Sequence, residues 1–580
     1  MAWVSRDEEN ATSVQPVERH ISAVFADILE DAGIRFVFGM PGGSTPFMFD
    51  GLVDRTGTIR TVLVRHEGGA AMMADMHARI TGKPAVVMGQ GPWIGTSGGI
   101  GIIESLFSGL PMVIVCDTSD YFSLPQHGPY QGGTGDYGSF DLVSIMRSMT
   151  KYATVAGTPS EFIHGLQQAI KHSVTGKPGP AAVLTKWNVA FESVALEHVK
   201  PTVYPIGGYL SVSPPCISDD DAEKAAQMLL SADAPVLIAG QGVRSAGAHE
   251  EVVTLAEMIG MPVATSYLGK SAVAETHDCA VGTMGSIGRK IANEKIMDSD
   301  LILAVGTALS PENTQWLDPS FIDPTRRKMI QIDIESRNAG WTFPVTLGIT
   351  SDAKPALKKI VTRLKDRADS TKATQRIEAL KAAKRRAKCF DEDIMHSDGV
   401  PIAPERVVKA VNRVIGNDDL LVLDAGNNRM FFAHHFQSKK AGQVLAAGGV
   451  AAIGYGPAAS LSAQMTCPDK RVICPCGDGG LMQHLYVFEM AREMKLPVTW
   501  VVMNNSCLGN VMDFQPPGRR IATRYQTVDF VRIAEGFGIA AKRVTKPEDL
   551  EDAIATAHNS SEPALVDVIT DDAPHFRLMA

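Results

Sequence analysis

The sequence lacks any uninterrupted apolar stretch of the roughly 18 residues that a membrane helix needs. Its first residues, MAWVSRDEENATSVQP, are polar and acidic and do not resemble a secretory signal. No long basic block occurs, and 55 Lys and Arg against 64 Asp and Glu give a formal net charge of −9. This balance argues against nucleic acid or an anionic membrane surface as the partner. We therefore expect a cytoplasmic protein that acts on a small molecule.

Cysteine is sparse and scattered. The chain has eight cysteines, and the closest pair, Cys474 and Cys476, is separated by a single proline. This spacing is neither a CxxC redox motif nor a set of zinc ligands. The cysteines are predicted to be buried or free thiols.

Short apolar segments recur along the whole chain and indicate its fold. Most end at or next to a Gly or Asp and are followed by helix-like periodicity, as in FVFGM, PMVIVCD, PVLIAGQG and LLVLDAG. Such segments are typical of buried parallel strands. We predict an α/β protein with three doubly wound parallel-sheet domains, at residues 17–190, 216–365 and 395–575. A Pro- and Gly-rich linker at about 194–215 and a charged connecting helix at about 366–388 separate them.

A glycine-rich turn and an Asn-Asn pair carry the strongest chemical signal. The turn follows the segment RVICPC and consists of Gly477, Asp478, Gly479 and Gly480. Asn505 ends the next predicted strand. Because consecutive strand ends lie at one edge of a parallel sheet, Asp478 and Asn505 are predicted to meet there. Their oxygens and the backbone carbonyl of Cys507 suit Mg²⁺ that also holds a phosphate group.

The glycines of this turn favour an anion next to the metal. Without side chains, Gly479 and Gly480 let the backbone approach a phosphate closely, with N–H groups at a helix start directed toward it. The sequence GDG alone is common in loops. The separation of 27 residues between Asp478 and Asn505, across a helix and a strand, resembles the cofactor-binding segment of thiamine diphosphate-dependent enzymes.

A second segment resembles the same enzymes near the N-terminus. The sequence VLVRHEGGAAMMADMHARITGKPAVVMGQGP is similar to the part of those enzymes that carries the activating glutamate. The resemblance implies that Glu67 hydrogen-bonds N1′ of the cofactor's aminopyrimidine and so promotes loss of the thiazolium C2 proton. The structural alternative is an ordinary helix-start glutamate that interacts with the helix dipole.

Further cofactor contacts are implied by resemblance. In LLVLDAGNNRMFFAHHF and VLAAGGVAAIGYGPAASLSAQM, Asn427 and Asn428 are expected to contact the diphosphate. Ala451 is expected to offer a backbone carbonyl, and Ile453 to hold the cofactor bent, which brings its reacting groups together. A turn-forming role for the asparagines and a core position for Ile453 are the alternatives. Other positions expected to bind the cofactor are Gly43, Pro92, Leu508 and Gly509.

The order and length of these segments are most similar to the acetolactate synthase-like group of thiamine diphosphate-dependent enzymes, from about residue 17 to 572. The resemblance implies a pyrimidine-binding, a central and a diphosphate-binding domain. It also implies a homodimer or homotetramer with active sites at the subunit interface. The expected enzyme is a lyase or transferase that forms or cleaves a carbon–carbon bond of a 2-oxo acid or a related 2-oxo compound.

The chain departs from that group where substrate is expected to bind. Trp93 follows Gly91-Pro92 where the group has glycine, and Phe514 stands where it has tryptophan. Ser44 and Phe47, next to the first glycine-rich turn, are candidate pocket walls.

The loop LPQHGPYQGGTGDYGSF is a further departure. Its side chains His127, Tyr130 and Gln131 are candidates for handling the substrate carbonyl or carboxylate, because they can donate to a developing oxyanion. His66 and His484 compete with them for this role.

Three questions stay open at this stage. The segment ALSPENT replaces an arginine-bearing segment, which argues against a structural flavin and leaves FAD or ADP in the central domain undecided. A 2-hydroxyacyl-CoA lyase or oxalyl-CoA decarboxylase-like enzyme is the alternative activity, although only the short segment DDAPHFRLMA follows the last predicted strand. A cofactor-binding paralogue without turnover is the third hypothesis, and the joint presence of Glu67, Asp478 and Asn505 argues against it.

Overall fold

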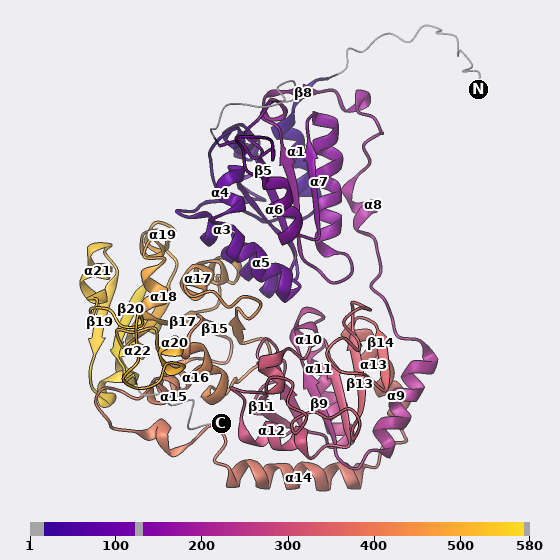
Figure 1. The fold of residues 1–580 in the computed structure, drawn as a ribbon, viewed down its shortest axis with the longest axis vertical. Coiled ribbons are helices and arrows are strands. Elements are labelled where there is room, and N and C mark those ends of the chain that lie inside the picture. The colour runs from indigo at the N-terminus through magenta and orange to yellow at the C-terminus, as the bar shows by residue number, and fades with distance from the viewer. Residues whose placement is uncertain (1–16, 122–130, 573–580) are drawn as a thin grey trace.

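The computed structural model describes residues 17–121 and 131–572. Within these residues the chain forms three six-stranded parallel sheets, each flanked by helices and built from consecutive parts of the sequence (Figure 1). The prediction of three doubly wound α/β domains is therefore confirmed. Each predicted range contains one sheet, while the exact domain limits remain a prediction.

The N-terminal sheet has the strand order β3-β2-β4-β5-β7-β6. Its central strands are buried along their whole length, as their unbroken apolar sequences predict. The strands are β2 (Phe36–Met40), β3 (Arg60–Leu63), β4 (Ala85–Gly89), β5 (Met112–Asp117), β6 (Tyr152–Ala156) and β7 (Pro180–Thr185). The main helices are α1 (Ile21–Asp31), α3 (Glu67–Thr81), α5 (Gly99–Ser108), α6 (Leu142–Met149) and α7 (Pro159–Val174).

The central sheet has the order β11-β10-β9-β12-β13-β14. Its strands are β9 (Pro235–Ala239), β10 (Val263–Thr265), β11 (Ala280–Thr283), β12 (Leu301–Val305), β13 (Lys328–Asp333) and β14 (Leu347–Thr350). Its helices include α9 (Asp219–Ser231), α10 (Gln241–Ser245), α11 (His249–Ile259), α12 (Lys290–Met297) and α13 (Ala353–Leu364). The predicted connecting helix is α14 (Ser370–Arg386), which runs along the bottom of the molecule toward the C-terminal domain (Figure 1).

The C-terminal sheet has the order β16-β15-β17-β18-β20-β19. Its strands are β15 (Leu420–Leu423), β16 (Val444–Ala446), β17 (Val472–Gly477), β18 (Val498–Asn504), β19 (Ala540–Val544) and β20 (Ala564–Ile569). Its helices are α15 (Pro404–Val414), α16 (Asn427–His435), α17 (Tyr455–Thr466), α18 (Asp478–Met482), α19 (Val487–Glu493), α20 (Gly509–Asp513), α21 (Phe530–Gly536) and α22 (Leu550–Asn559).

The N-terminal and C-terminal domains share one hydrophobic core. Helices α3 and α17 pack against each other between the two sheets (Figure 1), and one continuous apolar cluster contains buried residues of both. The small side chains of these helices allow a close approach, and Ser462 Oγ donates to the Met73 carbonyl oxygen at 2.7 Å. The N-terminal and C-terminal domains of one chain therefore form a packed unit.

Two further expectations can be compared with the structure. All eight cysteines are free and five of them are buried, as predicted. In the ranges 17–121 and 131–572, no helix has both the length and the apolar character required to cross a membrane.

Candidate active site

The paired strands β17 and β18 bring the predicted metal ligands to one edge of the C-terminal sheet. Gly477 pairs in parallel with Met503, so the residues that follow both strands emerge side by side. Asp478 is the first residue of α18, and its Oδ2 accepts the backbone N–H of Ser506 at 2.8 Å. The predicted meeting of these two strand ends is thus observed.

A cavity of about 330 Å³ opens at this edge. It collects every residue of the C-terminal domain for which the sequence predicts a cofactor contact: Asn427, Asn428, Ala451, Ile453, Gly477, Asp478, Gly479, Gly480, Asn505, Cys507, Leu508 and Gly509. Among the described residues, its lining comes from the C-terminal part of the chain alone. Ile453 lies in the turn before α17 rather than inside the helix, which leaves its side chain on the cavity wall.

The glycines of the turn are required by their surroundings. A Cβ atom on Gly480 would lie 2.0 Å from Oδ2 of Asp424, and one on Gly479 would lie 3.0 Å from Leu508 and from the Tyr525 hydroxyl. Asp424 is buried beneath the turn, where burial raises the pKa of its carboxyl group to about 7. The turn therefore presents bare backbone to the cavity.

The polar atoms of the cavity fit a magnesium-bound diphosphate. Oxygen ligands are available from the Asp478 carboxylate, the Asn505 amide and the Cys507 carbonyl, a set too small to enclose Mg²⁺ without further oxygens from a bound ligand. The Oδ1 atoms of Asn427 and Asn428 are buried and have no hydrogen-bond partner. These acceptor oxygens are costly unless a bound cation or an N–H donor satisfies them, which a phosphate oxygen cannot do.

Tyr525 is a neighbour of the predicted metal ligand that sequence reasoning missed. Its hydroxyl donates to Oδ1 of Asp478 at 2.8 Å, and Gly479 N–H donates to the same oxygen at 2.8 Å. Burial raises the pKa of Asp478, and these bonds oppose that effect. Tyr525 lies 47 residues beyond Asp478, and no pattern in the sequence connects the two.

The N-terminal domain gathers a second group of predicted residues at the carboxyl edge of its sheet. Asp117, at the end of β5, accepts the backbone N–H and the hydroxyl of Ser44 at 2.8 and 3.0 Å. A Cβ on Gly43 would lie 2.3 Å from Asp117 Oδ2. Asp117 also accepts the Gly91 N–H at 3.4 Å. This buried carboxylate, which the sequence analysis did not single out, fixes both predicted turns.

The predicted pocket residues of the N-terminal domain lie around those turns. Trp93 belongs to the short helix α4 (Gly91–Gly95), which begins at Gly91-Pro92. Gln131 Oε1 accepts from Gln90 Nε2 at 2.6 Å, so this residue of the loop 124–140 is held at the same edge. The Phe47 and Phe191 rings contact each other with centroids 4.5 Å apart.

Glu67 lies at the same edge, at the first position of α3, and is 6% exposed. Its neighbour His66 caps the helix by accepting the Gly68 N–H at 3.0 Å. The helix start faces Tyr486 of the C-terminal domain, where burial and the Glu67 charge both raise the pKa of the phenol. Glu67 does not line the 330 Å³ cavity of its own chain.

The loop that carries Ala451 is held by a carboxylate of the other domain. Glu104, on α5, accepts four consecutive backbone N–H groups: Gly448 and Gly449 on Oε1, both at 2.9 Å, and Val450 and Ala451 on Oε2 at 2.7 and 3.0 Å. Ala451 adopts a left-handed backbone with φ of 56°, which non-glycine residues adopt only when their surroundings impose it. Glu104 supplies that constraint.

A buried network on α3 supports Glu104. Arg79 pairs with Asp75 at 2.9 Å and with Glu104 at 3.3 Å, and the Tyr455 hydroxyl donates to Asp75. Burial alone would raise the pKa of Glu104, but the Arg79 charge and the loop N–H groups lower it to about 2. Glu104 therefore remains a carboxylate at every physiological pH.

Family models of known proteins match all three domains. The N-terminal TPP binding domain of thiamine pyrophosphate enzymes matches residues 19–136, the central domain 222–360, and the C-terminal TPP binding domain 424–568. The chain belongs to the thiamine pyrophosphate enzyme family. The resemblance on which the sequence analysis relied is thereby confirmed.

This thiamine pyrophosphate enzyme is similar to acetolactate synthase large subunits over most of its length. It is 29% identical to the probable acetolactate synthase large subunit of Methanococcus aeolicus, covering 94% of this chain and 90% of that protein. It is 29% identical to the Haemophilus influenzae acetolactate synthase large subunit and 28% to Escherichia coli acetolactate synthase isozyme 3 large subunit, each with 94% of both chains covered.

Some predicted residues of the thiamine pyrophosphate enzyme are not placed in either group. His127 and Tyr130 lie outside the described residues. Phe514 is 78% exposed and does not line the 330 Å³ cavity. The roles assigned to individual side chains remain predictions.

A cavity of about 620 Å³ lies at the carboxyl ends of the strands of the central domain, and residues of the N-terminal domain together with Gly448 and Gly449 form part of its wall. Its lining includes Gln241 and Gly242 after β9, Thr307 after β12 and Asp333 at the end of β13. The volume is in the range of cofactor sites. Whether FAD or ADP binds there stays undecided, and the visible absorbance and extracted nucleotides of the purified protein would test it.

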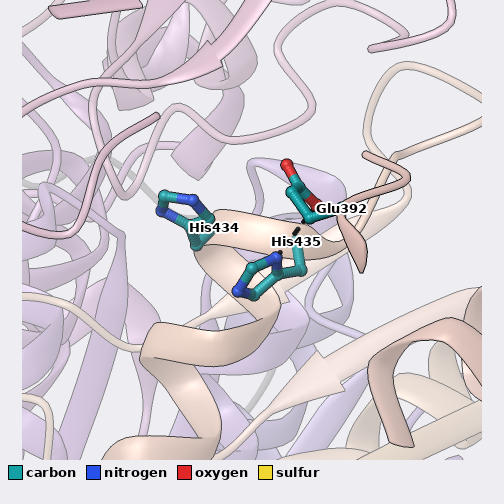
Figure 2. A group of neighbouring side chains, drawn as sticks. All are labelled: Glu392, His434 and His435. Carbon is teal, nitrogen blue, oxygen red and sulfur yellow. Dashed lines mark hydrogen bonds and ion pairs between the residues drawn. The ribbon is translucent and has the colours of Figure 1, made fainter. Parts of the chain in front are cut away.

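One histidine-rich cluster lies at the junction of the central and C-terminal domains of the enzyme. Figure 2 shows Glu392 beside His434 and His435 at the end of α16. His435 Nδ1 contacts Glu392 Oε2 at 3.2 Å, and Arg289 donates to Oε1 of the same carboxylate. Because a guanidinium already neutralises Glu392, we interpret the cluster as an interdomain ion-pair network.

Proposed function

We propose that this enzyme binds thiamine diphosphate through Mg²⁺ and forms or cleaves a carbon–carbon bond next to the carbonyl of a 2-oxo acid or a related 2-oxo compound. The similarity to acetolactate synthase large subunits supports this reaction class. The single observation that carries the proposal is the glycine cradle with its oxygen ligands at the edge of the C-terminal sheet. We expect a cytoplasmic enzyme of the lyase or transferase class.

In this proposal, Asp478, Asn505 and the Cys507 carbonyl hold Mg²⁺, and the Gly479 and Gly480 backbone faces the diphosphate. When bound, thiamine diphosphate supplies the carbon nucleophile and the electron sink of the reaction. The protein contributes the position of the cofactor, through Ala451 and Ile453, and the electrostatics of the site.

We propose that Glu67 acts on the cofactor held by a second copy of the chain. The 330 Å³ cavity has no lining residue from the N-terminal domain of the same chain among the described residues. Gly43, Pro92 and Gln131 accompany Glu67 at the edge of the N-terminal sheet. A homodimer, alone or within a homotetramer, would bring this edge to the partner's cavity.

Replacement of Glu67 tests the catalytic role. The Glu67→Gln variant should bind cofactor with an affinity close to that of the wild type but lose turnover, because the amide cannot exchange a proton with the aminopyrimidine. Exchange of the C2 proton of bound cofactor should fall toward the rate in free solution. The exposed Glu250→Gln variant on α11 is the control. Full turnover in the Glu67 variant would refute the assignment.

Mixing two inactive variants tests the assembly. If sites form between chains, equal amounts of Glu67→Gln and Asp478→Ala chains give mixed dimers in which one site is intact. After subunit exchange, about one quarter of the wild-type activity should return. If each site forms within one chain, the mixture stays inactive.

The substrate is best identified by a direct panel. Trp93 and the loop LPQHGPYQGGTGDYGSF differ from acetolactate synthases, so we propose a different donor or acceptor from that of those enzymes. The alternative is a 2-hydroxyacyl-CoA lyase or oxalyl-CoA decarboxylase-like activity. A panel of 2-oxo acids and 2-hydroxyacyl-CoA compounds, read by mass spectrometry of products, separates the two.

A further inference from the structure

A cavity of about 210 Å³ lies where the three domains meet, apart from the two cavities already described. Arg79 and Ile80 at the end of α3 come from the N-terminal domain, and Arg244 and His249 come from the central domain. The C-terminal domain contributes the loops 417–420 and 440–443, with Leu445, Cys467 and Lys470. No part of the proposed reaction uses this space.

Arg244 is the unusual member of this lining. Its Nη1 donates to the backbone carbonyls of Leu268 and Lys270 at 3.4 and 3.3 Å. Within the described parts of the chain it forms no ion pair, and the formal charge that acts on it most strongly is the like charge of Arg79. Arg244 is half-buried and lines the cavity.

The other charged groups of the lining do not neutralise Arg244. Asp418 pairs with Lys440 at 2.5 Å, and Asp419 accepts from His558 at 2.9 Å. Arg79 is already paired with two carboxylates. Lys470 adds a further positive charge to the wall. The lining therefore contains four cationic side chains and two carboxylates, both of which have other partners.

A guanidinium that is removed from bulk water without a counter-ion is costly. Burial and the charge of Arg79 lower the pKa of Arg244 to about 9, because both disfavour the charged guanidinium. An anion inside the cavity would offset this unfavourable energy. The planar donors of arginine suit the oxygens of phosphate or carboxylate, and a nearby lysine adds a point charge.

We propose that this junction cavity is a binding site for a small oxyanion of the phosphate class, held by Arg244 and Lys470. The volume accommodates inorganic phosphate or a small phosphate ester, but not a nucleotide cofactor of drug-like size. Because the wall comes from all three domains, the bound anion stabilises their arrangement. It also lies against the end of α3, the helix that begins with Glu67.

The test uses the full-length enzyme saturated with thiamine diphosphate and Mg²⁺, so that the diphosphate cavity is filled. Inorganic phosphate is titrated at constant ionic strength, with sulfate, acetate and chloride as comparison anions and a small phosphate ester as a separate arm. Binding is measured by calorimetry and by the midpoint of thermal unfolding. Saturable stabilisation by phosphate or the ester, and not by chloride, is expected.

Variants assign the response to this cavity. Arg244→Gln should weaken phosphate binding by about thirtyfold or more, because it removes one partner of a buried charge pair. Without phosphate the same variant should be about as stable as the wild type, since it removes an unpaired, half-buried charge. Lys470→Gln, on the wall, should weaken binding less and provides a second variant if Arg244→Gln does not fold. The exposed Arg385→Gln variant on α14 is the matched control.

Three results would overturn the proposal. The first is a wild-type enzyme with no saturable phosphate response. The second is an unchanged response in both the Arg244 and the Lys470 variants. The third is a response that disappears when cofactor is saturating, because phosphate would then have occupied the diphosphate cavity.

Discussion

The Glu104→Gln substitution tests whether the N-terminal domain positions the loop that carries Ala451. The carboxylate accepts four backbone N–H groups of residues 448–451. A glutamine of the same shape keeps one acceptor oxygen and places an amide donor where the second oxygen was. Two N–H groups then lose their acceptor and face another donor.

The expected magnitude follows from those two bonds. Hydrogen bonds to a charged group contribute about 1.5–3 kcal/mol each, so the loop should lose roughly 3–6 kcal/mol of local stability. If only half of the lower figure is expressed in cofactor binding, the Kd for thiamine diphosphate should rise about tenfold. The remainder should appear as local opening of the loop.

Two measurements separate this role from a general loss of stability. Calorimetric titration of thiamine diphosphate at saturating Mg²⁺ gives the change in Kd, and hydrogen exchange reports the amides of residues 448–451. Both should change in Glu104→Gln and remain as in the wild type in Glu294→Gln, whose carboxylate is solvent-exposed on α12. A folded Glu104→Gln enzyme with wild-type cofactor affinity and unchanged exchange would refute the reasoning.

Two further substitutions probe the cofactor site, and a third probes the pH dependence of the protein's stability. Asp478→Ala should abolish Mg²⁺-dependent cofactor binding in calorimetry, and wild-type binding would exclude Asp478 as a metal ligand. Gly480→Ala should weaken cofactor binding at least about 100-fold, because its Cβ collides with Asp424. The control Gly536→Ala should have little effect, because no atom lies within 4 Å of the added Cβ. Burial lowers the pKa of His77 from 6.5 to about 4, so His77 takes up a proton at higher pH in the unfolded chain than in the folded protein. The free energy of unfolding should therefore fall by roughly 3 kcal/mol as the pH drops from about 6.5 toward 4. Thermal unfolding of His77→Gln should show a smaller loss across that window, and an equal loss would contradict the assignment.

The sequence predicted those parts of the site that depend on local pattern. The turn at Gly477–Gly480 and the strand end at Asn505 are recognisable because a short motif and a parallel-strand rule together determine where they emerge. Glu67 was identified through resemblance to a known segment, and its place at the start of a helix agrees with the structure. The turn and the strand end need only the order of strands and helices along the chain.

Other parts of the site depend on contacts between distant segments. Glu104 lies 344 residues before Gly448, and its surrounding sequence, IGIIESLFSG, reads as an ordinary buried helix. Asp117 ends a strand like many other aspartates, and only the fold shows that it fixes the Gly43 turn. The left-handed backbone of Ala451 could not be predicted either, because an alanine in the sequence does not indicate a positive φ. Charge or strain imposed from another domain leaves no local signal.

Helix α3 carries residues of two parts of the proposed site. Its first residue is the acid proposed to serve a neighbouring subunit, and Asp75, about 12 Å further along its axis, belongs to the network behind the Glu104 clamp. A sliding or tilting of this helix would displace both ends together. In the proposed dimer, this helix would connect the loop that positions the cofactor of one subunit to the acid that serves the cofactor of its neighbour.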